Sequence, residues 1–297
     1  MFCEQCGQQI GNEEKFCTNC GSPVLLKDSH QNDKEEMPVM TSLPKSSSFG
    51  LRQIITILVV LGFIGLGVYG SIDDDAVEKN NDALKNLELG NAEQGIQQLN
   101  DASQSAVTKE NKINTLKNLG YAYDGEGKTE EALASFQQAL ALTTQNTFDY
   151  YLVSGEVALL ESKPNSAAVS FKKAYELNPE NFQINNSLAL FYIDLENTAP
   201  QYVDYPKALT HALKARSINE SETARQNLGL AYFFNDNYDQ AISLFSQSNL
   251  DQHPIASLWL GLAYAGKEDK INAKLYIQKA LHAGIEVPQE VLDYVNS

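Results

Sequence analysis

The chain of 297 residues is expected to be an all-α protein, in which an array of helical hairpins follows one long apolar helix and a small cysteine-rich head. Three observations predict this organisation. All four cysteines lie between positions 3 and 20, residues 53–72 contain no charged side chain, and small and aromatic residues recur about every 34 positions after residue 73. The hydrophobic fraction of 43% is typical of a chain that buries cores over most of its length.

The head carries Cys3, Cys6, Cys17 and Cys20 in the pattern C-x2-C-x10-C-x2-C. Each CxxC turn directs two sulfur atoms at one ion, and four thiolates complete a tetrahedral zinc site that leaves no position for substrate water. Residues 1–24 are too few to build a core, so a bound metal would stabilise them. Two disulfides, four free thiols and a redox pair are the alternatives. The segment resembles the zinc-ribbon heads of prokaryotic membrane proteins, which implies one structural zinc ion.

A polar tether and an apolar helix are expected next. Residues 25–50 hold two prolines and clustered Ser, Asp, Glu and Lys, which is typical of a flexible linker. At about 1.5 Å per residue, a helix over residues 53–72 matches the thickness of a bilayer, so one transmembrane helix is expected. Lys45 and Arg52 precede this run and Asp73–Asp75 follow it, which predicts a cytoplasmic N-terminus and an extracytoplasmic array in the cell membrane. The charge bias is small, and the inverted orientation stays open.

A recurring pattern predicts the hairpin array in residues 76–297. The close-packing point of the first helix is a small residue, at Gly120, Gly155, Ala189, Gly229 and Gly261. A second small residue follows on the second helix, at Ala132, Ala167, Ala208, Ala241 and Ala273. A large apolar position comes next, at Phe136, Phe171 and Phe245. An ordinary helical bundle would not require these residue types at the same offsets in successive segments.

These residues resemble the tetratricopeptide repeat, which implies hairpins stacked into a right-handed superhelix. The resemblance covers nearly all of Ala76–Pro288 and gives about six repeats and a capping helix. Their expected ranges are 76–109, 113–146, 148–181, 182–221, 222–253 and 254–287, with the cap at 288–297. The first repeat is degenerate. In the fourth, Asn197–Tyr205 inserts about seven extra residues and Ala212 replaces the large aromatic, which predicts a looser hairpin with a protruding loop.

The resemblance also implies that first helices line a concave groove in which a partner peptide lies. Groove positions in this sequence are Lys117, Asn118, Tyr121, Asp124, Asp149, Leu152, Glu156, Asn186, Leu190, Gln226, Asn227, Leu230, Phe233, Leu258 and Leu262. The groove is expected to run from polar to apolar. Tyr121 stands where chaperone-tail binders of this family need an asparagine, which disfavours that partner class.

Charge narrows the partner class further. Residues 73–297 hold 31 of the 38 acidic and 17 of the 22 basic residues, a net charge of about −14. A basic or apolar peptide suits such a domain, whereas an anionic polymer or lipid surface does not. In the head, Lys15 stands alone against Glu4, Glu13 and Glu14, which disfavours nucleic-acid binding there as well.

No pattern in the sequence indicates an enzyme or a small-molecule substrate. A nucleophile beside a base, paired carboxylates in a cleft and an open metal site are all missing from the motifs. The sequence therefore favours a membrane-anchored scaffold that binds a peptide or protein partner. The alternative is a transmembrane sensor whose cytosolic zinc ribbon contacts transcription machinery or another protein.

Overall fold

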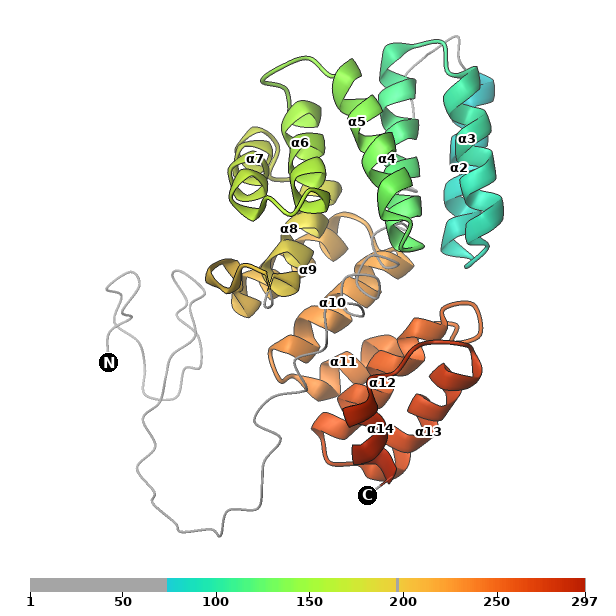
Figure 1. Cartoon of the computed structure of the whole chain (residues 1–297), viewed down its shortest axis with the longest axis vertical. Helices are drawn as coiled ribbons and strands as arrows, with labels where there is room; N and C mark the ends of the chain where they lie inside the picture. The colour runs from blue at the N-terminus through green and yellow to red at the C-terminus, as the bar shows by residue number, and fades with distance from the viewer. Residues whose placement is uncertain (1–73, 196–197, 297) are drawn as a thin grey trace, which may run out of the picture. The chain divides into compact units, whose positions relative to one another are not determined.

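A computed structural model of the protein describes residues 74–195 and 198–296, and these residues form thirteen α-helices, one 3-10 helix and no β-strand (Figure 1). The helices pair as hairpins, and we call the first helix of each hairpin its A helix and the second its B helix. The hairpins are α2 (Asp74–Glu88) with α3 (Ala92–Ser105), α4 (Lys109–Gly125) with α5 (Thr129–Leu142), α6 (Phe148–Leu160) with α7 (Pro164–Leu177), α8 (Phe182–Asp194) with α9 (Tyr205–Ile218), α10 (Glu222–Phe234) with α11 (Tyr238–Phe245), and α12 (Pro254–Gly266) with α13 (Lys270–His282). Helix α14 (Gln289–Asn296) follows the last hairpin. The predicted all-α array of helical hairpins is confirmed.

The zinc ribbon, tether and transmembrane helix expected in residues 1–72 lie outside the described residues. Within 74–195 and 198–296, no helix combines the length and the apolar composition that crossing a membrane requires. The same residues contain no group of three or more His, Cys, Asp or Glu side chains placed to hold a metal ion.

The turn between the A and B helices has the same backbone form in five of the hairpins. One residue in each of these turns has a positive φ, at Gly90, Gly127, Ser162, Asp236 and Glu268. In each turn the amide of the following residue bonds to a carbonyl five residues before it, as when Lys128 N donates to Tyr123 O at 2.8 Å. This left-handed ending satisfies helix carbonyls that would otherwise lack donors. The repeated turn therefore gives successive hairpins the same tight reversal.

Close packing between A and B helices follows the pattern of glycine and phenylalanine. A Cβ atom on Gly120 would lie 2.8 Å from the ring of Phe136, and one on Gly229 would lie 2.7 Å from the ring of Phe245. Both phenylalanine side chains are fully buried. A methyl group at either glycine would displace an aromatic side chain that has no free space to enter. The recurring small residues of the sequence therefore mark the crossing points of the hairpins.

The fourth hairpin differs from the expected looser hairpin with a protruding loop. Between α8 and α9 lies the 3-10 helix η1 (Pro200–Tyr202), and the ring of Tyr202 contacts that of Phe191 on α8, with centroids 5.5 Å apart. Ala199 is only 2% exposed, and the hydroxyl of Tyr202 donates to Asn165 Oδ1 on α7 at 2.6 Å. The amide of Asp204 donates to Tyr192 O at 3.0 Å, which fixes the start of α9. Ala199, Tyr202 and Val203 thus hold this connection against the array, because they join the apolar cluster that α7 and α8 form.

Candidate functional site

The predicted groove positions all lie on A helices, from α4 to α12. All of them except Asp124 and Asp149 are buried. Leu152, Leu230 and Leu258 are at most 1% exposed, so they act as core side chains between hairpins. Phe233 also contacts Trp259 of the next A helix, with ring centroids 5.4 Å apart. The apolar part of the set is therefore packed inside the array.

The polar members form hydrogen bonds from one hairpin to the next. We call the set Asn80, Lys117, Asn118, Tyr121, Asp149, Glu156, Asn186, Ser187 and Asn227 the polar ladder. At its start, Asn118 Nδ2 on α4 donates to Asn80 Oδ1 on α2 at 2.9 Å. Lys117 Nζ on α4 donates to Asp149 Oδ1 on α6 at 2.5 Å, and the lysine side chain is only 4% exposed. The first three A helices are thus joined by one hydrogen bond between two amides and by one ion pair.

Glu156 on α6 is the centre of the polar ladder. Its Oε1 accepts hydrogen bonds from the Tyr121 hydroxyl on α4 at 2.9 Å and from the Ser187 hydroxyl on α8 at 2.5 Å. Burial raises the pKa of Glu156 to about 7, although both hydrogen bonds act in the opposite direction. Burial and the neighbouring Glu156 charge also raise the pKa of Tyr121, so the phenol stays protonated and donates. One carboxyl group therefore links three hairpins.

No cation balances Glu156 among the described residues. Its interactions there are the two hydroxyl donors, both on Oε1, and Oε2 receives no hydrogen bond. A buried carboxylate without a cation is costly, and its raised pKa expresses that cost.

The ladder continues from α8 to α10 and leaves acceptor atoms unused. Asn227 Nδ2 donates to Asn186 Oδ1 at 2.6 Å. Gln226 Nε2 donates to Glu222 Oε1 at 2.5 Å, and because a carboxylate can only accept, this bond fixes which amide atom of Gln226 is the oxygen. In the described part of the chain, Gln226 Oε1 and Asn227 Oδ1 are buried and have no hydrogen-bond partner. Such atoms are uncommon in folded proteins, because each costs about 1–3 kcal/mol.

The sequence identified most of the ladder but not all of it. Asn80 and Ser187 complete the hydrogen bonds of Asn118 and Glu156, and neither occupies a predicted groove position. Ser187 directly follows the predicted Asn186, and this adjacency is the feature of the sequence that could have indicated it. Asn80 belongs to the degenerate first repeat, where the register is weak. Asp124 is partly buried at the far end of α4.

Comparisons with known proteins agree with the helical-repeat fold and with the zinc ribbon predicted for residues 1–24. Residues 2–24 match the zinc-ribbon domain family, and residues 115–150 match the family of the tetratricopeptide repeat. The second match spans most of α4, all of α5 and the start of α6. Tetratricopeptide repeats are generally non-enzymatic scaffolds for protein and peptide partners, and neither matched family is catalytic. No curated protein sequence matches the chain.

Several solved structures are similar to part of this chain. A chain of the APC/C hetero-tetramer Cut9-Hcn1 is 18% identical with a TM-score of 0.51, over 75% of this chain and 42% of that one. A tetratricopeptide repeat protein from Parabacteroides merdae is 20% identical with a TM-score of 0.40, over 72% of this chain and 81% of that one. PilF of Pseudomonas aeruginosa is 20% identical with a TM-score of 0.46, over 63% and 82%. The protein thus spans less than half of the first of these chains, and identities this low concern the fold alone.

Proposed function

We propose that the protein is a membrane-anchored interaction scaffold that binds a basic peptide segment of a partner protein along its A helices. The observation that carries this proposal is the excess of hydrogen-bond acceptors on the A helices. Glu156 lacks a cation, and Gln226 and Asn227 each keep a buried oxygen without a donor in the described part of the chain. A ligand that fits these atoms must supply N–H groups and positive charge.

The charge of the whole array supports the same ligand class. Residues 73–297 have a net charge of about −14, which raises the local concentration of a basic segment and speeds its encounter with the array. A lysine, arginine or terminal amine beside Glu156 would return this carboxyl group to its charged form, because an opposite charge lowers a carboxyl pKa. The cation would remove the cost of burying the Glu156 charge, and this gain would add to the affinity of the array for a basic peptide.

The anchor and the head complete the proposal. The uncharged run of residues 53–72 would hold the array at the cell membrane, and the flanking charges would leave the zinc ribbon in the cytoplasm. Cys3, Cys6, Cys17 and Cys20 are a donor set that suits one structural zinc ion, and a reducing cytoplasm would keep their thiolates available. Protease treatment of intact cells tests this orientation: digestion of the array from outside is expected, and full protection of the array would contradict it.

Peptide binding to the full-length chain in detergent tests the proposed ligand class. Fluorescence anisotropy would compare labelled peptides rich in Lys and Arg with peptides of the same length rich in Asp and Glu. Basic peptides are expected to bind at least about tenfold more tightly at pH 8.5, and Glu156→Gln should remove about tenfold of that affinity, because it removes the buried partner charge. Glu130→Gln is the matched control, since Glu130 is exposed on the B helix α5. Equal binding of both peptide classes would overturn the proposal.

A further inference from the structure

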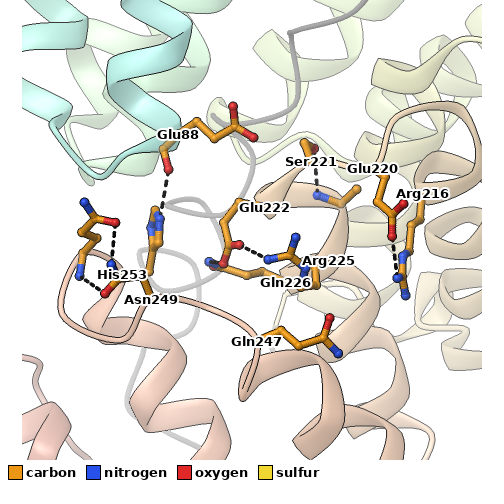
Figure 2. Close-up of polar contacts among 12 residues, drawn as sticks. Glu88, Arg216, Glu220, Ser221, Glu222, Arg225, Gln226, Gln247, Asn249 and His253 are labelled. Carbon is orange, nitrogen blue, oxygen red and sulfur yellow. Dashed lines mark hydrogen bonds and ion pairs between the residues drawn. The ribbon is translucent and has the colours of Figure 1, made fainter.

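The turn between α2 and α3 contacts the loop between α11 and α12, although these segments are far apart in the sequence. Figure 2 shows the side chain of His253 directed at the backbone of Glu88, and His253 Nε2 lies 3.0 Å from Glu88 O. Because a carbonyl oxygen can only accept, Nε2 must carry the proton and donate. We call this contact, between residues 88–91 and residues 249–253, the seam.

Gly90 lets the two backbones meet at the seam. Its φ is +77°, and a Cβ atom there would overlap the carbonyl oxygen of Gln252 and lie 3.1 Å from its carbonyl carbon. Any other residue would therefore push the loop away or leave the left-handed backbone conformation of the turn. Gly284 offers a matched comparison, because its φ is +82° and a Cβ atom there would meet nothing within 4 Å.

The seam is a thin contact compared with the crossings inside each hairpin. A cavity of about 550 Å³ lies beside it, lined by Gly90 and Asn91 on one side and by Gln252, His253 and Ile255 on the other. Among the described residues, no phenylalanine, tyrosine or tryptophan lines this cavity, whereas buried phenylalanines fill the crossings of the second, third and fifth hairpins. A contact that leaves this space unfilled buries less apolar surface than a filled crossing, so it opens at a lower free-energy cost.

Polar atoms buried near the seam favour such opening. Gln226 Oε1 on α10 and Ser257 Oγ on α12 are buried without a hydrogen-bond partner in the part of the chain that the structure describes. Ser257 lies one helical turn after His253, and Gln226 bonds to Glu222, whose charge acts on His253. Each unsatisfied atom costs about 1–3 kcal/mol, so the closed arrangement keeps a penalty that water or a ligand would remove.

We propose that the seam is a latch, which closes over the first turns of α10 and α12 and opens to give a partner access to the polar atoms there. The partner in this statement rests on the proposed function, whereas the opening itself does not. When the latch opens, Glu88 O and His253 Nε2 exchange their mutual bond for bonds to water, and the unpaired oxygens of Gln226 and Ser257 gain hydrogen-bond partners. The acidic side chain of Glu222, which is 8% exposed when the latch is closed, would become accessible.

Hydrogen–deuterium exchange and carboxyl labelling of the full-length chain test the latch without any partner. Gly90→Ala is expected to raise amide exchange about tenfold in residues 86–92 and 249–256, and to raise carbodiimide labelling of Glu222 several-fold. Gly284→Ala carries the same backbone strain but should leave both segments and Glu222 unchanged. His253→Ala, which removes the hydrogen bond without adding bulk, should act in the same direction as Gly90→Ala. His282→Ala is its control, because His282 is exposed and its ring bonds to Gln278 O within its own helix.

Two results would overturn the latch. If Gly90→Ala and Gly284→Ala change amide exchange in residues 86–92 and 249–256 by the same factor, the effect comes from backbone strain and not from the contact with Gln252. If exchange rises at the seam but labelling of Glu222 stays at the wild-type rate, the contact covers nothing on α10. Far-UV circular dichroism must keep its helical signal in each variant, and His253→Ala supplies the answer if Gly90→Ala does not fold. Absence of basic-peptide binding by wild-type protein would reject the proposed function but leave these measurements unaffected.

Discussion

Replacing Glu156 by glutamine should stabilise the array at alkaline pH. The substitution keeps an oxygen that can accept from Tyr121 and Ser187 and removes the buried charge. Burial raises the pKa of Glu156 from 4.5 to about 7 in the folded protein. Because the folded state holds this proton more tightly than the unfolded chain, the stabilising contribution is complete below pH 4.5 and is lost as the pH rises through 7.

The size of the effect follows from these two pKa values. One pKa unit corresponds to about 1.4 kcal/mol, so the ionised carboxyl group of Glu156 costs roughly 3 kcal/mol well above pH 7. Between pH 5.5 and pH 8.5, the wild-type protein should lose about 2 kcal/mol of unfolding free energy relative to Glu156→Gln. Both conditions lie above the isoelectric point of about 4.6, so the protein keeps a negative net charge in each.

Urea unfolding, followed by circular dichroism at 222 nm, measures this difference. Wild-type protein, Glu156→Gln and Glu130→Gln would be compared in full-length form at both pH values. The curve of Glu156→Gln should lie at higher urea than wild type at both pH values, and the gap should be larger by about 2 kcal/mol at pH 8.5 than at pH 5.5, while Glu130→Gln follows wild type at both. A constant difference across this range would refute the reasoning, because it would mean that the charge of Glu156 is not desolvated in the folded array.

Three further changes have defined outcomes. Gly229→Ala should lower the free energy of unfolding by about 1–3 kcal/mol, because its methyl group would meet the ring of Phe245; thermal unfolding measures the loss, and an unchanged midpoint would contradict it. Thr147→Ala should cost about 1 kcal/mol, because the Thr147 hydroxyl caps α6 by accepting from the Tyr150 amide at 3.3 Å; Thr144→Ala, outside the helices, is the control. Elemental analysis should find one zinc ion per chain in the wild-type protein and much less zinc in Cys17→Ser. The helical circular-dichroism signal of the array should stay unchanged in this variant, and wild-type protein without metal would reject the zinc site.

The sequence predicted the hairpins because their determinants are local. Gly120 and Phe136 lie on the two helices of one hairpin, so the close approach that they permit repeats wherever the pattern repeats. The same register placed Tyr121 and Glu156 on successive A helices, and the structure joins them by a hydrogen bond of 2.9 Å. The zinc-ribbon match over residues 2–24 likewise covers the four cysteines that the spacing singled out.

What the sequence did not predict depends on how each hairpin packs against others. Ser187 completes the bonds of Glu156 because α8 meets α6 at a particular rotation, and no residue pattern within one repeat encodes that rotation. Most of the predicted groove side chains proved to be buried for the same reason. The seam between Gly90 and Gln252 is the extreme case, since it arises from the summed rotations of all intervening hairpins.

The sequence by itself thus determined the repeating unit, the small residues at its crossings and the cysteine set of the head. Only the tertiary structure decided which polar side chains pair between hairpins, that Glu156 is buried without a cation in the described part, and that the first hairpin touches the loop before α12. The physical reason is range: hydrophobic periodicity and turn chemistry act over a few residues, whereas burial and closure depend on the geometry accumulated along the array.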